Sequence, residues 1–342
     1  MIKYHHLNWK YTLGLMLEIQ ISSQKETRDQ QGFTHLAEHL LFYGNKDKDY
    51  NKLSEDIYNL FGKLEAVTDP NSVRIYAQFD IKDIELVKVF LSNMIYNSDL
   101  QEKDFSFVSR EIYEEIQEYT ESSSFYHKKR VQKYIPKLHS LVGNWEEGEL
   151  TYKICKEAQE YWNTSVQKSS IENYFIGNWQ DDWIKDFQNI FKQKSSIEAI
   201  KKSEMKIMKT SSKELIYEYL INYTITQDIF LSWLEEVVYK NNMESLIFNR
   251  GNKKYFSIIS DIDINLNLFE YKSFKKAFDY IKKIYLSGLG MDIDGINYKS
   301  TLNRLQLYNK ITDIQNNSLE DIYYKIKLLQ TQDFQEYFTS LK

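Results

Sequence analysis

Cysteine is almost absent from this sequence, and proline and glycine are scarce. The 342 residues include one cysteine, Cys155, two prolines and eleven glycines. A single cysteine excludes a disulfide within the chain, which is typical of proteins in a reducing compartment. So little proline and glycine argues against long disordered linkers. We therefore expect a chain that is folded along most of its length.

Long apolar runs and an excess of positive charge are also lacking. No run of about 18 apolar residues occurs, so we predict no transmembrane helix. The N-terminal residues lack the apolar segment and cleavage site of a signal peptide, which predicts a cytoplasmic protein. Lys and Arg number 44 against 49 Asp and Glu, a net charge of −5. Without a basic stripe interleaved with aromatic residues, a nucleic-acid partner is not expected.

Length and composition indicate a folded protein of two domains. Hydrophobic residues make up 42% of the chain and charged residues 27%, as is usual for folded proteins. Single cores rarely exceed roughly 250–300 residues. A lysine-rich polar stretch at 193–203 is the expected linker. We predict a first domain over 1–198 and a second, shorter one over 204–342.

The order of strand-like and helix-like patterns predicts an α+β fold. In the first half, strands are expected at 11–21, 62–68, 73–79 and 170–176, with helices at 31–43, 50–61, 82–96, 102–134, 151–163 and 180–192. This order is typical of an antiparallel sheet with helices on one face. The second half begins again with strands at 204–209 and 214–223, a helix at 226–240, strands within 254–271 and a helical end. We therefore predict two related domains, the second shortened.

Residues 35 to 39 read His-Leu-Ala-Glu-His. On a helix, His35, Glu38 and His39 project from one face, because positions i, i+3 and i+4 are neighbours. Two imidazoles one turn apart can bind a divalent metal, and a carboxylate beside them can take a proton from bound water. The order inverts that of the His-Glu-x-x-His zinc helix.

Two histidines on a helix often have no metal role. Here the apolar flanks Phe33, Leu36 and Leu40 predict a core helix, where charged groups are costly unless they are paired or bind a metal. A catalytic zinc needs a third protein ligand. The residue pattern leaves that ligand open among the remaining candidates: His5, His6, His127, His139, and the acidic row Glu111, Glu115 and Glu118, which could equally be a solvated helix face.

The stretch Gly-Phe-Thr-His-Leu-Ala-Glu-His-Leu-Leu-Phe-Tyr-Gly at 32–44 resembles the inverted zinc motif of the insulinase/pitrilysin metallopeptidases, a family that includes mitochondrial processing peptidase. Gly-Lys-Leu-Glu-Ala-Val-Thr at 62–68 resembles the family's edge strand, written Gly-x-x-Asn-Ala-x-Thr. Glu-Glu-Ile at 114–116 resembles the segment that carries the third ligand, and Glu115 follows His39 by 76 positions. The resemblance covers about residues 10–195 and extends weakly to the end.

The resemblance implies a function for each of these positions. His35, His39 and Glu115 would hold Zn²⁺, and Glu38 would be the general base. Zinc can lower the pKa of bound water to about 7. Further residues would contact an extended peptide substrate, through the edge strand or from the second domain: Glu65, Ala66, Thr68, Arg250 and Tyr255. Pairing of the peptide with the edge strand is a β-augmentation.

Three positions depart from the family pattern. Glu65 stands where the family has Asn, and it either selects against acidic peptides or simply faces solvent. Val108 stands seven residues before Glu115, where an acid is often found near the metal. Arg250 and Tyr255 lie five positions apart, whereas the family's Arg and Tyr are seven apart.

Family members of this length form half of a clamshell that two chains close around a peptide. An intact zinc motif with a weak substrate clamp predicts a heterodimer with a related, metal-free subunit, and a homodimer is the second choice. The predicted function is a zinc endopeptidase for short or unfolded peptides. Leader removal from a ribosomally made peptide such as a bacteriocin and general peptide degradation both stay open.

Two other functions compete with this prediction. The chain could be a non-catalytic structural or peptide-holding subunit, although all four key residues of the zinc motif are present. It could also be a metal-dependent hydrolase of another substrate class, if the family resemblance is accidental. A nucleophilic Cys155 is the weakest of these alternatives, because its helix-like surroundings offer nothing to activate a thiol.

Overall fold

The computed structural model describes residues 3–6, 9–69, 71–121, 145, 148–191, 205–211, 214–220, 225–250, 253–260, 263–288 and 329–334. The chain divides into two compact units: residues 2–122 and 139–197 form one, and residues 1, 123–138 and 198–342 form the other. The expected linker at 193–203 lies outside the described residues, so the domain boundaries of 198 and 204 stay predictions.

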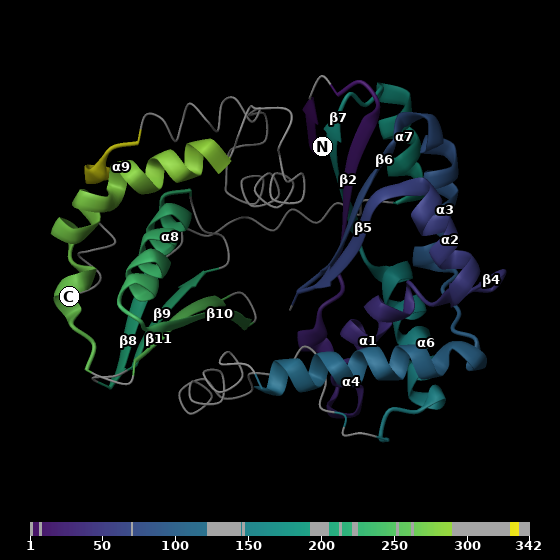
Figure 1. Ribbon diagram of the computed structural model, residues 1–342, viewed down its shortest axis with the longest axis horizontal. Helices are drawn as coiled ribbons and strands as arrows, with labels where there is room; N and C mark the ends of the chain where they lie inside the picture. Colours follow the sequence, from purple (N-terminus) through teal and green to yellow (C-terminus); the bar gives the residue numbers. More distant parts are fainter. Residues whose placement is uncertain are drawn as a thin grey trace. The chain divides into compact units, whose positions relative to one another are not determined.

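A five-stranded sheet is the centre of the first unit (Figure 1). Its strands, in spatial order, are β1 (Lys3–His6), β7 (Ile171–Gly177), β2 (Thr12–Ile19), β6 (Val73–Asp80) and β5 (Phe61–Thr68). All neighbours are antiparallel except β1 and β7, which run parallel. β5 therefore forms one edge of this sheet, as the sequence predicted for residues 62–68.

The helices described in this unit are α1 (Phe33–Leu40), α2 (Tyr50–Leu60), α3 (Ile84–Tyr96), α4 (Phe105–Glu121), α6 (Tyr152–Lys168) and α7 (Asp181–Ile190). α4 packs with α1 and α6 in a separate cluster, and the other helices contribute residues to an apolar cluster on one face of the sheet. Figure 1 shows α2, α3 and α7 along this face. Alternate residues of β2 point into it and are fully buried in one apolar cluster with residues of α3 and α7: Leu13, Leu15, Leu17, Val87, Leu91, Ile184 and Phe187. The β2 residues between them, such as Met16 and Glu18, point to the other face of the sheet and are also buried.

α1 lies between two apolar clusters. Ala37 belongs to the cluster on the sheet, whereas Leu36 and Leu40 belong to a second cluster with residues of α4 and α6. That second cluster includes Val108 and Cys155. A helix that is apolar on several sides is typical of a buried position. Its few polar side chains must therefore find partners or a ligand.

The second unit contains a four-stranded antiparallel sheet with the order β10-β11-β9-β8. Its strands are β8 (Met205–Ser211), β9 (Glu214–Leu220), β10 (Glu244–Arg250) and β11 (Lys253–Ile259). Helices α8 (Ile225–Lys240) and α9 (Tyr271–Gly288) pack on each other through Trp233 and Phe274, whose rings are 5.3 Å apart. The predicted α+β class is confirmed.

Some predicted elements were wrong or incomplete. The strand expected within 254–271 ends at Ile259, and Leu266–Phe269 is a short 3-10 helix. β1 and β10 were not anticipated, because each strand is stabilised by a partner that composition does not reveal. The helix predicted over 102–134 begins at Phe105, and its part beyond residue 121 lies outside the described residues. Among the described helices, none is long and apolar enough to cross a membrane.

Candidate metal centre

The start of α1 is fixed by a carboxylate from the preceding loop. Glu26 accepts the backbone N–H groups of Gly32 and Thr34, at 2.8 and 2.7 Å. The first N–H groups of a helix have no partner within it, and a negative charge there is favoured by the helix dipole. Gly32 has a left-handed φ of 92°, which a residue with a side chain rarely adopts. The helix thus begins directly before the His-Leu-Ala-Glu-His motif.

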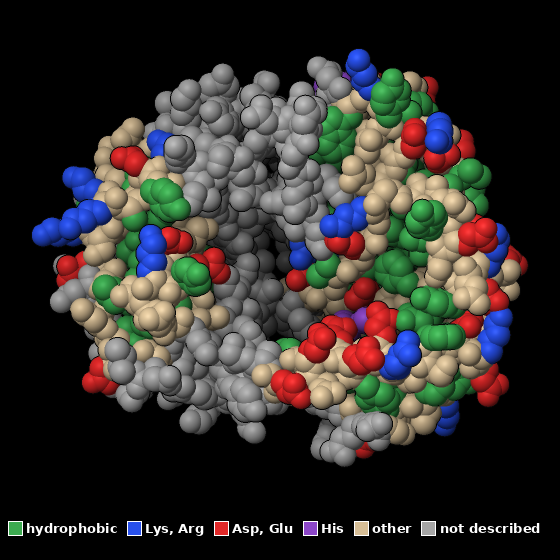
Figure 2. Space-filling view, viewed as in Figure 1, with side chains coloured by type: hydrophobic (Ala, Val, Ile, Leu, Met, Phe, Trp, Pro, Cys, Tyr) green, Lys and Arg blue, Asp and Glu red, His purple; other side chains and the backbone are tan. Residues whose placement is uncertain are grey.

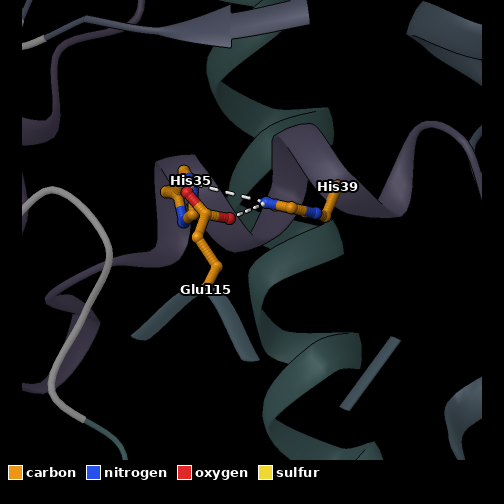
Figure 3. A group of neighbouring side chains, drawn as sticks. All are labelled: His35, His39 and Glu115. Carbon is orange, nitrogen blue, oxygen red and sulfur yellow. Dashed lines mark hydrogen bonds and ion pairs between the residues drawn. The ribbon is translucent and has the colours of Figure 1, made fainter. Parts of the chain in front are cut away.

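His35, His39 and Glu115 converge on one point (Figure 3). The Nε2 atoms of the two imidazoles are 3.3 Å apart. Glu115, from α4, brings Oε1 to 3.3 Å from His35 Nε2 and Oε2 to 3.0 Å from His39 Nε2. One ligand atom from each residue lies within 4.8 Å of the others. Two elements far apart in sequence therefore supply a three-donor set.

This donor set fits a zinc ion. Two imidazole nitrogens and one carboxylate oxygen form one of the ligand sets of catalytic zinc sites. With zinc–ligand bonds of about 2.0–2.2 Å, tetrahedral ligands lie roughly 3.3–3.6 Å from one another, close to the separations found here. The buried Nδ1 of His35 has no hydrogen-bond partner among the described residues. The three side chains could hold the metal without moving far.

The charges of the site depend on one another. Burial lowers the pKa of the His39 imidazole, but hydrogen bonds to Glu111 and Glu115 outweigh it and raise that pKa to about 10. The pKa of Glu115 is lowered well below its usual range, mainly by hydrogen bonds to His35 and His39. Without a metal, the charges of His39 and Glu115 therefore stabilise each other.

Glu38 lies beside this set, with 8% of its surface exposed. Burial raises the pKa of its carboxyl group, although the nearby imidazoles of His39 and His35 oppose that effect. The Thr68 hydroxyl, at the end of β5, donates to Glu38 Oε2 at 3.3 Å. A buried acid beside a candidate metal site is the environment expected of a general base.

These residues open into one pocket of about 660 Å³. Its walls come from α1, α2, α4 and β5, and its lining includes Phe42, Tyr43, Tyr50, Ile57, Ala66, Val67 and Thr68 besides the polar residues of the site. Figure 2 shows histidine side chains among acidic ones on this face. The pocket lies entirely within the first unit and borders the edge strand of its sheet.

The structure distinguishes the three acids that the helix pattern left open. Glu115 contacts both histidines. Glu111 lies one turn earlier, at 3.4 Å from His39 Nδ1, and also accepts the Tyr43 hydroxyl. Glu118 is exposed and does not line the pocket. The contact between Glu111 and His39 was missed from the sequence, where the only signal was its i, i+4 spacing from Glu115.

The other candidate residues have varied surroundings. Glu65 forms an ion pair with Lys63 at 2.7 Å and is not part of the pocket lining, whereas Ala66 and Thr68 are. Arg250 ends β10, and Tyr255 pairs with Phe248 on the neighbouring strand. The side chains of Arg250 and Tyr255 lie outside the described part of the structure, so their predicted substrate contacts stay predictions.

Two further residues are fully buried. Val108 packs in the cluster that holds α1, so no acid occupies the position seven residues before Glu115. Cys155 lies in the same cluster, and burial raises the pKa of its thiol to about 12. A thiol in that state is not a nucleophile at neutral pH, which contradicts the alternative that placed Cys155 in a reaction.

Residues 6–140 match the model of the insulinase family, peptidase family M16. Over these residues the chain is similar to the insulinase family. The matched residues include the whole motif of α1 and the Glu115 position, so the resemblance stated from the sequence is confirmed at the level of the family. The family is named for its peptidases, so residues 6–140 are peptidase-like.

Relatives with curated names extend the comparison. The uncharacterized zinc protease YmxG of Bacillus subtilis is 22% identical over 212 residues, which cover 57% of this chain and 49% of that protein. The mitochondrial-processing peptidase subunit beta of Blastocladiella emersonii is 28% identical over 175 residues, which cover 50% of this chain and 34% of the subunit. The chain thus aligns with no more than about half the length of these relatives.

A solved structure shows the same fold. The periplasmic protease PqqL from Escherichia coli superposes with a TM-score of 0.61 and 14% identity, over 99% of this chain and 45% of PqqL. At that identity, the match shows a shared fold and nothing about activity. The fold shared with PqqL therefore extends beyond residues 6–140.

Proposed function

We propose that this protein is a zinc-dependent endopeptidase that cleaves short or unfolded peptides. The observation that supports this most is the convergence of His35, His39 and Glu115, with ligand atoms within 4.8 Å of one another. Glu38 lies beside them in an open pocket. The name of the Bacillus subtilis relative, a zinc protease, supports the same metal and reaction.

Each residue of the proposed site has one role. His35 and His39 from α1 and Glu115 from α4 would hold Zn²⁺. When bound, zinc would act as a Lewis acid toward water and the scissile carbonyl. Glu38 takes the proton of the attacking water and passes it to the leaving amine. Thr68 donates a hydrogen bond to one oxygen of Glu38, which keeps that carboxylate oriented toward the pocket.

The proposed substrate is an extended peptide at the edge of the sheet. β5 pairs with β6 on one side and is the outer strand of its sheet. Residues Ala66 to Thr68 of this strand border the same pocket as the candidate metal ligands. A peptide that pairs with β5 would thus pass the site with its backbone held. Leader segments of ribosomally made peptides, such as bacteriocin precursors, and peptides that undergo general degradation both satisfy this requirement.

We also propose that the chain works with a second subunit in the cytoplasm. The Blastocladiella emersonii relative is named as one subunit of its peptidase. A related subunit without the metal would complement a chain that has the metal ligands, and a homodimer is the second choice. Arg250 and Tyr255 stay candidates for contacts with the substrate.

Zinc content and peptide cleavage test this function together. Purified wild-type protein should contain about one zinc per chain and cleave an unstructured peptide. The Glu38→Gln variant keeps a similar shape, so it should retain zinc and lose turnover by roughly 10²–10⁴-fold, the typical contribution of a general acid or base.

Two outcomes would contradict the proposal. Activity of Glu38→Gln equal to wild type would exclude Glu38 as the base. Less than half an equivalent of zinc, with no cleavage after zinc is added, would instead favour a non-catalytic subunit. If the chain alone cleaves as fast as any mixture with a related subunit, the second subunit is unnecessary.

A further inference from the structure

The two nitrogens of the His39 ring contact two different carboxylates. Nε2 lies 3.0 Å from Glu115 Oε2, on the side of the candidate metal site. Nδ1 lies 3.4 Å from Glu111 Oε1, on the opposite side of the ring. His35 differs, because its buried Nδ1 has no hydrogen-bond partner among the described residues. Only His39 therefore has an outer carboxylate in this part of the chain.

Glu111 is in turn held by an aromatic side chain. The Tyr43 hydroxyl, three residues beyond the end of α1, donates a hydrogen bond to Glu111 Oε2. The Tyr43 ring stacks on Tyr50 at 4.9 Å, with the planes 16° apart. Tyr50 in turn stacks on Phe107 at 5.5 Å. These contacts form a closed chain. It runs from Glu111 on α4 to Tyr43 after α1, then to Tyr50 on α2, and back to Phe107 on α4.

Three of these residues follow one row of α4. Phe107, Glu111 and Glu115 are spaced four residues apart, so their side chains lie on one side of the helix, one turn after another. Phe107 ends the aromatic stack, Glu111 contacts His39, and Glu115 reaches the candidate metal site. Because the three residues belong to one rigid helix, the contacts that hold Phe107 and Glu111 in place also determine the position of Glu115.

A metal-binding imidazole needs one nitrogen as an acceptor, which requires the proton on the other nitrogen. Ligand histidines commonly donate that N–H to a carboxylate, which orients the ring. Glu111 is placed to accept it from His39 Nδ1. Val108, where the family often has an acid, is buried among apolar side chains and cannot do so.

We propose that Glu111 is a positioning residue for the metal centre, and that Tyr43 holds Glu111 in that role. Glu111 accepts the Nδ1 proton of His39 and leaves Nε2 free to bind zinc, while the bond to Tyr43 keeps α4 in the register at which Glu115 reaches the same ion. This inference rests on the proposed zinc site. It assigns the outer acid of this chain to residue 111, one turn before the third ligand.

Zinc affinity measured by competition with a chelator tests the proposal. Glu111→Gln keeps the size of the side chain and removes its charge. It should weaken zinc binding by about 10–100-fold, the usual effect of losing such a partner. Tyr43→Phe removes only the hydroxyl and should weaken binding several-fold. Glu118→Gln, at an exposed position of the same helix, is the matched control and should bind like wild type.

The protonation of His39 gives a second measurement that does not depend on activity. In zinc-loaded wild-type protein, nitrogen-15 NMR should show a protonated Nδ1 whose hydrogen exchanges slowly with water. In Glu111→Gln, that hydrogen should exchange faster. A role in packing alone would change the melting temperature of the metal-free protein and leave this signal as it is.

The outcomes separate the inference from the function on which it rests. If wild type binds no zinc, the proposed function fails, and the His39 signal of the metal-free protein still tests the contact with Glu111. If wild type binds zinc and Glu111→Gln binds it equally well, the inference is wrong. If Glu111→Gln does not fold, Tyr43→Phe decides, and unchanged zinc affinity in that variant overturns the role of Tyr43.

Discussion

The hydroxyl of Thr68 donates a hydrogen bond to the carboxylate of Glu38, with Oγ1 and Oε2 3.3 Å apart. Thr68 is the last residue of the edge strand β5, and Glu38 is the acid of the motif on α1. This hydrogen bond therefore connects two parts of the proposed site. One is the strand that would bind the substrate, and the other is the proposed general base. The residues proposed to bind the peptide and the residue proposed to transfer the proton therefore meet at the same wall of the pocket.

Replacing Thr68 by Val should lower kcat by about tenfold, because a hydrogen bond to a charged group contributes roughly 1.5–3 kcal/mol and this one is long. Thr68→Ser keeps the hydroxyl and should retain most of the activity. Zinc content should be the same in both variants, since neither change touches a proposed ligand. Steady-state kinetics with one peptide measures the effect. If the Thr68→Val and Thr68→Ser variants have equal kcat values, the Thr68 hydroxyl does not orient Glu38.

Zinc should stabilise the folded protein, because it would bind the assembled site and not the unfolded chain. Free zinc at 100 times its dissociation constant should add about 2.7 kcal/mol to the free energy of unfolding. Chelation should remove that gain, and Glu115→Gln should abolish it.

Glu114→Gln provides the matched control for this measurement. Glu114 precedes the proposed ligand, and 68% of its side chain is exposed. Its substitution should leave the zinc-dependent shift in melting temperature unchanged. If Glu114→Gln removes the shift and Glu115→Gln does not, the third ligand has been placed one position too late.

Glu65→Gln should change substrate preference modestly. Glu65 pairs with Lys63 on the edge strand, so its loss leaves a positive charge beside the proposed path of the peptide. We expect kcat/KM for an acidic peptide, relative to a basic one, to rise by about two- to fivefold, since partly exposed ion pairs contribute roughly 0.2–1 kcal/mol. Matched peptides that differ only in charge measure this ratio. An unchanged ratio would favour the interpretation that Glu65 simply faces solvent.

Cys155 should resist thiol reagents while the protein is folded. Burial raises the pKa of its thiol to about 12, so almost no thiolate exists at pH 8. In the unfolded chain the pKa is about 8.5, and the same thiol should react readily in denaturant. Rapid labelling of the native protein at pH 8 would contradict this burial.

The same shift in pKa has a consequence for stability. As pH rises from about 9 toward 12, the unfolded thiol loses its proton before the folded one. The contribution of Cys155 to stability is therefore complete below about pH 8.5 and declines through that window. Cys155→Ala should show a shallower loss of stability over the same range, measured by denaturant unfolding.

Much of the first unit could be predicted because its signals are local. β2 follows from its run of mostly apolar residues, which are buried on both faces of the sheet, and α1 follows from apolar flanks around its polar face. β1 was missed because strand pairing depends on a partner that lies elsewhere in the chain. β1 pairs with β7, more than 160 residues away, and a four-residue strand has too little pattern to be recognised.

For the site itself, the sequence alone determined that His35, Glu38 and His39 share one face, because helical spacing requires it. Spacing did not decide among Glu111, Glu115 and Glu118, since all three lie on nearly the same face of α4. Only the packing of α4 against α1 brings Glu115 to both Nε2 atoms and Glu111 to the far side of His39. Distances of a few ångströms between helices depend on side-chain packing across the core, and no local pattern contains that information.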